Sequence, residues 1–174
     1  MPSRPSHAVG FLLGFWLALV AFLSLVPAAA HGAGTPDPEL ARLESLLAGS
    51  VNGYRGQHRL IPLLRRPDLD AVARAHSRDM AARNYLAHRS PEGADWVARL
   101  GSARVEGFAM AGENVGVTSR NPPNEEILNG WIHSTVHREN LLARPYNATG
   151  IGIARAADGS LYYTQLYLSF PVDP

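Results

Sequence analysis

The complete absence of cysteine from this 174-residue chain limits both how it can fold and what chemistry it can perform. Disulfide bonds, thiolate nucleophiles and cysteine-ligated metals are all excluded. The fold must therefore be held together by an apolar core, and the length suffices for one domain with such a core. Any metal site must be built from histidine, aspartate or glutamate side chains.

The charge of the chain is close to balanced. The formal net charge is +1, and all 16 basic residues are arginine. A nearly neutral chain gives no electrostatic reason to expect a nucleic-acid partner. The absence of lysine excludes Schiff-base chemistry and a lysine nucleophile.

The N-terminus has the pattern of an export signal. Arg4 supplies a positive start, residues 8–26 are almost entirely apolar, and Ala28 and Ala30 supply the small residues that precede a signal-peptidase cut. The alternative is an uncleaved membrane anchor, because the apolar run approaches the ~20 residues of a spanning helix.

This pattern predicts a signal peptide over residues 1–30, a linker over residues 31–38 and one domain over residues 39–174. With either alternative, we expect the domain outside the cytoplasm, secreted, periplasmic or extracellular. Contact with a membrane is expected only through the N-terminal segment, if that segment is not cleaved.

Hydrophobic periodicity predicts an α+β domain. Apolar residues at helical spacing predict a helix over residues 39–59 and a second one from about residue 67, with Asp68 as its cap. Further helices are expected over residues 90–100 and from Asn124, which is expected to cap its helix. Alternating segments predict three strands, with a hairpin turn at Asp158-Gly159. The strands cover residues 110–117, 150–156 and 161–170.

Two histidine candidates favour structural roles. His133 and His137 are four residues apart, which suits a shared metal on one helical face. A metalloprotease motif needs glutamate after the first histidine, and Ser134 stands there, so we expect His133 to be exposed helix surface. His76 lies on the apolar face of the second helix, where a core histidine with one hydrogen bond is the favoured interpretation.

A dispersed set of His88, Glu113 and His137 is the stronger candidate site. Two imidazoles and a carboxylate match a zinc ligand set with room for water, and they equally match a general acid/base pair. The structural alternative is that Glu113 orders a turn and His88 ends a helix. A serine hydrolase is disfavoured, because no Gly-x-Ser-x-Gly motif is present and nothing local supports Ser90 or Ser134 as a nucleophile.

Eight segments together resemble one known family, the CAP superfamily of cysteine-rich secretory, antigen 5 and pathogenesis-related-1 proteins. They include Ala-Gly-Glu-Asn-Val at 111–115 and the stretch from Trp131 to Leu142. The others are residues 51–55, 60–63, 73–81, 84–93, 146–153 and 162–167. With no cysteine, the chain is similar to the bacterial SCP-like branch. The resemblance implies a three-layer α-β-α sandwich with a small antiparallel sheet and a surface cleft.

The resemblance also implies a reduced site. Animal members hold two histidines and two glutamates in the cleft, which can bind zinc or another divalent ion. His88 and Glu113 match the first histidine and first glutamate, whereas Ser134 and Tyr162 replace the other two. Bacterial members carry the histidine matched by His137. The candidate catalytic or metal-binding residues are therefore His88, Glu113 and His137, with Zn²⁺ or another divalent cation as the expected ion.

Two functions follow from this site. The favoured one is an exported binding or envelope-associated module that takes a small lipid, a peptide or a cell-wall component in its His/Glu cleft. The alternative is a metal-assisted or acid/base hydrolase of peptide or cell-wall substrates. Fold alone does not choose between them.

Overall fold

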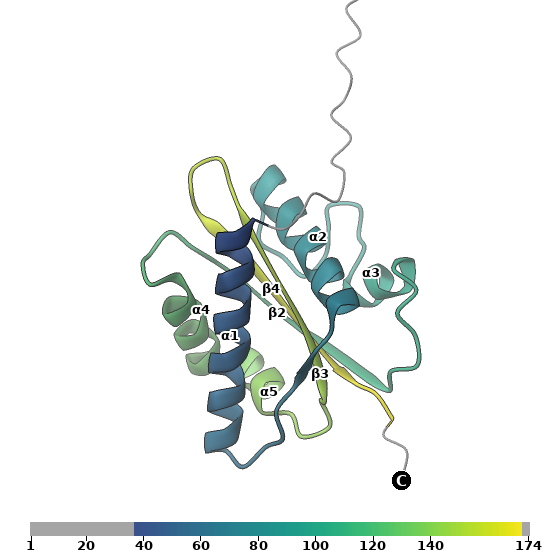
Figure 1. The fold of residues 1–174 in the computed structure, drawn as a ribbon. Helices are drawn as coiled ribbons and strands as arrows, with labels where there is room; N and C mark the ends of the chain where they lie inside the picture. Colours follow the sequence, from purple (N-terminus) through teal and green to yellow (C-terminus); the bar gives the residue numbers. More distant parts are fainter. Residues whose placement is uncertain (1–36, 172–174) are drawn as a thin grey trace, which may run out of the picture. The chain divides into compact units, whose positions relative to one another are not determined.

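The computed structural model describes residues 37–171. The predicted signal peptide and nearly all of the predicted linker lie outside these residues. The described chain contains, in order, the following elements (Figure 1): α1 (Pro38–Gln57), β1 (Leu64–Arg65), α2 (Pro67–Arg83), α3 (Trp96–Ser102), β2 (Met110–Thr118), α4 (Pro123–His133), α5 (Thr135–Leu142), β3 (Ala148–Arg155) and β4 (Leu161–Ser169). None of the helices in this described part is long and apolar enough to cross a membrane.

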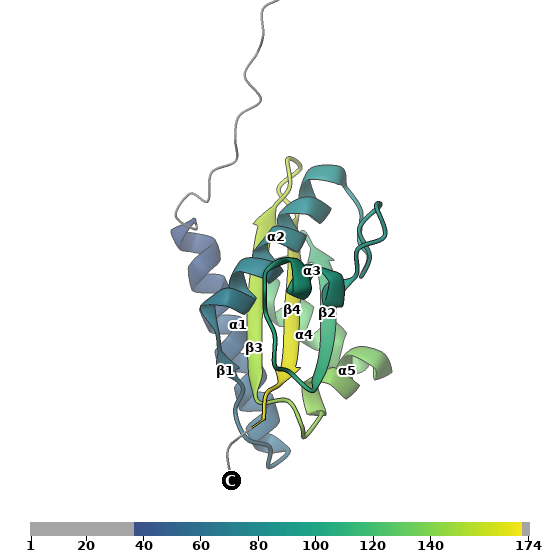
Figure 2. The ribbon, with the colours of Figure 1, turned by 90° about the vertical axis from the view of Figure 1, so that its right-hand side faces the viewer.

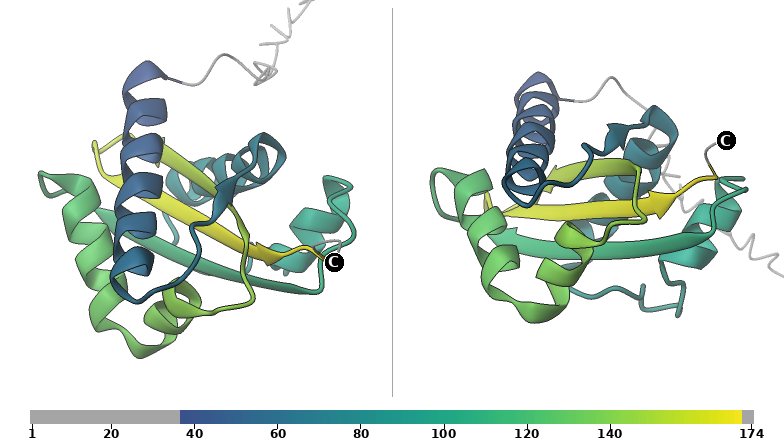
Figure 3. Two further views of the ribbon diagram at one scale, coloured as in Figure 1. Left: turned by 60° about the horizontal axis from the view of Figure 1, so that its bottom comes forward. Right: turned by 90° about the horizontal axis from the view of Figure 1, so that it is seen from below.

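The four strands form one sheet in the order β1-β3-β4-β2. The three long strands lie side by side (Figure 3) and pair antiparallel, whereas the two-residue β1 is parallel to β3. The prediction of an α+β fold with a small, mainly antiparallel sheet is confirmed. The turn between β3 and β4 places Gly159 at φ +88°, a conformation that glycine adopts without strain.

Alternation along the strands divides the core into two layers. On one face, Ile151, Ile153 and Tyr163 pack with α1, α4 and α5. On the other, Leu166 and Leu168 pack with α2 and α3. Figure 2 shows α2 and α3 in front of the sheet, with α1 and α4 behind it. The described residues thus form the expected α-β-α sandwich.

Two glycines bring α2 into direct contact with β3. A Cβ atom on Gly150 would lie 2.2 Å from the backbone carbon of Leu69, and one on Gly152 would lie 2.0 Å from the backbone nitrogen of Arg74. Neither partner can move aside, because both atoms belong to the helix backbone. The Gly-Ile-Gly sequence of β3 is therefore required by helix–sheet packing.

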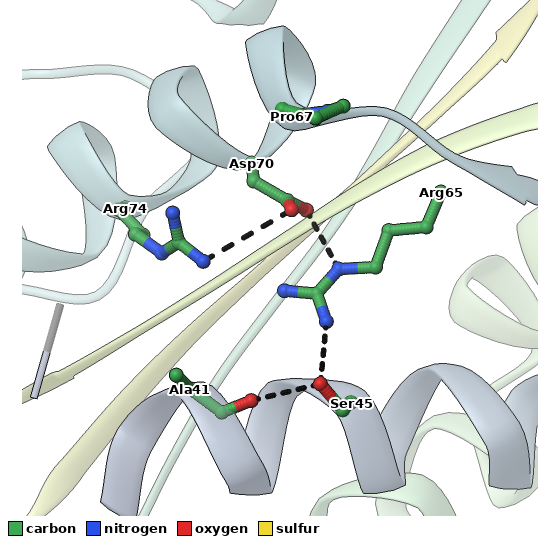
Figure 4. A pocket seen from close by; sticks show the side chains of 6 residues that line it. All are labelled: Ala41, Ser45, Arg65, Pro67, Asp70 and Arg74. Atoms are coloured by element: carbon green, nitrogen blue, oxygen red, sulfur yellow. Dashed lines mark hydrogen bonds and ion pairs between the residues drawn. The ribbon is translucent and has the colours of Figure 1, made fainter. Parts of the chain in front are cut away.

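Carboxylates protect the outer edge of β3 beyond the short β1. Asp70 Oδ1 accepts a hydrogen bond from the backbone nitrogen of Ile151 (2.8 Å), and Glu44 Oε1 accepts one from Ile153 (3.2 Å). Arg65 and Arg74 hold the two carboxylates in place by ion pairs. Both arginines and Asp70 line a cavity between α1 and α2 (Figure 4). An edge covered in this way cannot pair with another strand.

The second helix begins at Pro67, as predicted, but two predicted caps and one predicted helix start differ in the structure. Arg66, rather than Asp68, is the N-cap of α2, and Pro122 rather than Asn124 is that of α4. Asn124 instead uses its side chain to bind the Leu43 carbonyl oxygen at 2.8 Å. The helix expected over residues 90–100 begins only at Trp96, capped by Asp95. Local signals are present at all three starts: proline occupies the first turn of α2 and of α4, and the Asp95 side chain caps α3 by accepting from the backbone nitrogen of Ala98.

Candidate functional site

Glu113 lies in the middle of β2, the edge strand opposite β1, and its side chain is 0% exposed. It pairs with Leu166 across the sheet, so it faces the layer formed by α2 and α3. Its two carboxylate oxygens have separate partners. Oε1 lies 2.9 Å from His88 Nδ1, and Oε2 accepts a hydrogen bond from Arg99 Nη2 at 2.5 Å.

His88 lies between α2 and α3, in a segment fixed from two sides. His76 Nε2 lies 2.9 Å from the Ala87 carbonyl oxygen, and Arg99 Nη1 donates to the His88 carbonyl oxygen at 3.1 Å. The imidazole packs edge-on against Trp96, with ring centroids 5.7 Å apart. The side chain of His88 is still 40% exposed, so one side of the ring reaches solvent.

His137 approaches the same place from the opposite layer. Its helix, α5, is fixed to β2 because Asn114 Nδ2 donates to the His137 carbonyl oxygen at 3.1 Å. The ring centroids of His88 and His137 are 6.5 Å apart. Burial, and then the charge of His88, lower the pKa of His137. The two imidazoles therefore meet at the β2 edge, and His137 is mainly neutral near pH 7.

The neighbours of Glu113 fix the tautomer of His88. Because Glu113 is paired with the guanidinium of Arg99, it is a carboxylate and can only accept hydrogen bonds. His88 Nδ1 must then be the donor. In the neutral ring, this leaves the lone pair on Nε2, where it can accept a proton or a hydrogen bond.

The predicted zinc ligands fit this arrangement only in part. Among residues 37–171, no group of three or more histidine, aspartate or glutamate side chains is placed to hold a metal ion. The Glu113 carboxylate is buried and shared between Arg99 and His88, so a metal bound directly to Glu113 does not fit. Zinc binding stays a prediction for measurement.

The other two histidines considered from the sequence, His76 and His133, lie outside the candidate site. His76 is buried and makes one hydrogen bond, as expected, and burial lowers its pKa. His133 is exposed, also as expected. The structure further separates His133 from His137, because α4 ends and α5 begins on either side of Ser134.

Sequence reasoning missed Arg99 and Trp96. Both lie on α3, a seven-residue helix, and neither forms part of a motif with a spacing that suggests a site. The only signal was indirect. A buried glutamate on a strand requires a cationic partner. Arg99 is one of the arginines that lie between His88 and Glu113 in the sequence.

The described residues thus define a class of protein: a three-layer α-β-α domain with a His–Glu pair at the edge of its sheet. The model of the cysteine-rich secretory protein family, CAP, matches residues 49–167. The chain belongs to this family. The family and the fold inferred from the sequence are confirmed.

Two bacterial proteins are similar to the chain in sequence. The chain is 31% identical over 145 residues to the uncharacterized protein YkwD of Bacillus subtilis, covering 82% of this chain and 54% of YkwD. It is 32% identical over 125 residues to the uncharacterized membrane protein YlbC of B. subtilis, covering 72% of this chain and 34% of YlbC. The chain therefore spans about half the length of these relatives or less.

Solved structures share the fold. An extracellular SCP-domain protein from Bacillus anthracis is 29% identical, with a TM-score of 0.66, and the match covers 79% of this chain and 45% of that one. An outer surface protein from Borrelia burgdorferi has a TM-score of 0.68 at 16% identity, covering 75% and 94% of the two chains. The second likeness shows the fold alone.

Proposed function

We propose that this chain is an exported module that binds a component of the bacterial cell envelope at the surface around His88 and His137. The observation that carries the proposal is the fixed, half-exposed His88 imidazole, oriented by a buried Glu113–Arg99 pair and adjacent to His137. A side chain held in one orientation before binding loses little entropy when a ligand arrives.

An envelope location has independent support. The N-terminal pattern predicts export, the B. anthracis neighbour is described as extracellular, and YlbC is described as a membrane protein. These descriptions apply to those proteins, and we extend the location to this chain as part of the proposal.

Exposed aliphatic side chains occur near the site residues in the sequence, which is compatible with a ligand that has both polar and apolar parts. Three exposed aliphatic side chains are close in sequence to the site residues: Leu86, Val97 and Val136. They accompany His88, Trp96 and His137, respectively. A peptide, such as the peptide part of the bacterial cell wall, offers hydrogen-bonding groups to the imidazoles and aliphatic side chains as well, and it is the ligand class that we propose.

Co-sedimentation with purified insoluble cell wall tests this function. We expect the wild-type protein to sediment with the wall, and His88→Gln and His137→Gln each to reduce the bound fraction several-fold. His133→Gln, an exposed histidine outside the site, serves as the matched control and should bind like wild type. Equal binding by all four proteins, or no binding by wild type, contradicts the proposal.

An acid/base hydrolase is the second candidate. The Glu113–His88 arrangement is that of a carboxylate orienting a base, and the His88 side chain is 40% exposed. Against it, no hydrogen bond within residues 37–171 joins a serine or threonine hydroxyl to His88 or His137, so a nucleophile would have to be water. Release of new amino groups from cell wall by wild type, lost in Glu113→Gln, would establish this second function instead.

A further inference from the structure

Arg99 occupies the position from which a metal ion would act on Glu113. Its guanidinium lies 2.5 Å from Glu113 Oε2, and the Arg99 side chain is only 14% exposed. A divalent cation bound to the same carboxylate would stand next to this fixed positive charge, in a place with little water to screen the repulsion. The ion would have to displace Arg99 first.

The same guanidinium organises the rest of the site. Besides Glu113, Arg99 Nη1 donates to the carbonyl oxygens of His88 (3.1 Å) and Ala94 (3.0 Å). One side chain thus connects α3, the segment that carries His88, and β2. A structural zinc ion would provide the same combination of positive charge and several oriented contacts.

We infer that Arg99 is the built-in cation of this site: it supplies the positive charge that holds Glu113 as a carboxylate, so that Glu113 orients His88 and does not bind a metal. This inference deepens the proposed function, since it assigns a positioning residue to the proposed ligand surface. It rests on the proposed function only in assuming that the oriented His88 serves to bind a ligand, and its test needs no ligand.

Zinc calorimetry on a set of variants tests the inference. We expect Glu113→Gln to leave the Zn²⁺ affinity of the wild-type protein unchanged. Removing the guanidinium in Arg99→Gln should raise the affinity about tenfold or more, since changes next to a metal ligand typically alter affinity on that scale. The gain should disappear in the double variant Arg99→Gln/Glu113→Gln, which accounts for zinc bound by other histidines.

Arg89→Gln is the matched control. Arg89 belongs to the same region, is largely exposed and pairs with Asp95, not with Glu113. It should leave zinc affinity at the wild-type value. Zinc binding by wild type that depends on Glu113, or a folded Arg99→Gln variant with no gain in affinity, overturns the inference.

A measurement on the wild-type protein covers the case in which Arg99→Gln does not fold. Nitrogen-15 NMR of the neutral His88 ring should show the proton on Nδ1. A proton on Nε2 would mean that Glu113 donates to His88 and is not held as a carboxylate, which overturns the inference. Neither readout depends on cell-wall binding, so failure of the proposed function and failure of this inference are distinguishable.

Discussion

Glu113 and Asn114 are neighbours on β2 whose side chains point to opposite faces of the sheet. Glu113 binds His88 and Arg99 in the α2–α3 layer, whereas Asn114 binds the backbone of His137 on α5. Because successive residues of a strand alternate between faces, one dipeptide positions both imidazoles. The two histidines meet only because β2 is an edge strand, around which both layers can reach.

Replacing Asn114 should disturb the position of His137 and leave that of His88 intact. Its amide also donates to Tyr167 and accepts from Asn140 Nδ2, so Asn114→Ala leaves several buried groups without partners. We expect a loss of about 1–3 kcal/mol in the free energy of unfolding, measured by urea denaturation. The NMR signals of the His137 ring should shift more than those of His88. Asn129→Ala, at an exposed position of α4, should change neither; larger shifts at His88 would contradict this division.

Gly152 and Gly53 should respond to alanine with opposite signs. Gly152→Ala places a methyl group against the α2 backbone, and we expect a destabilisation of about 1–3 kcal/mol or more. Gly53 lies inside α1 with no atom within 4 Å of a Cβ position, so Gly53→Ala should stabilise the protein by up to about 1 kcal/mol. Thermal and urea unfolding measure both. A neutral Gly152→Ala variant would contradict direct packing of α2 on β3.

The buried His76 should make stability depend on pH below neutrality. Burial lowers its pKa, while Glu113 raises it and Arg99 lowers it to smaller extents. The unfolded chain therefore binds a proton near pH 6.5 that the folded protein does not. Stability should fall as the pH drops below about 6.5, by at most about 1.4 kcal/mol per pH unit for this residue.

Unfolding free energies at pH 7.5 and 5.5 measure this effect. His76→Gln, which can still donate to the Ala87 carbonyl oxygen, should lose less stability across the interval than wild type. His133→Gln should keep the wild-type dependence, because His133 is exposed. The lowered pKa values of Asp68 and Asp79 act at lower pH, whereas the lowered pKa of His137 acts in the same window and contributes equally in all three proteins. An unchanged slope in His76→Gln would rule His76 out as its source.

The sequence predicted elements better than it predicted contacts. Periodicity located α1, the second helix and the three long strands, because burial of an apolar face dominates those segments. The caps predicted at Asp68 and Asn124 were wrong, and the Asn124 side chain binds the distant Leu43 carbonyl oxygen instead. Similarly, nothing local indicated that Ser134 ends one helix and precedes another.

The sequence indicated three residues of the candidate site, but it did not indicate how their side chains are arranged. His88, Glu113 and His137 do gather at the β2 edge, yet only His88 and Glu113 share a hydrogen bond. Arg99 was missed because its significance arises from tertiary proximity to a buried carboxylate. No sequence pattern reports such a pairing, although a buried glutamate demands one.

Arg55 is a fully buried arginine, and its replacement by lysine should be strongly destabilising. The residue is 0% exposed, and its guanidinium donates to the carbonyl oxygens of Ile61, Leu141, Ala143 and Tyr146. A lysine ammonium has three donors and cannot reproduce this planar fork. We expect Arg55→Lys to cost about 3 kcal/mol or more, measured by urea unfolding, because carbonyls and a cation are left buried without full partners. Arg42→Lys, at an exposed position of the same helix, should be close to neutral, and similar losses in the two variants would show that the four carbonyl contacts contribute nothing specific.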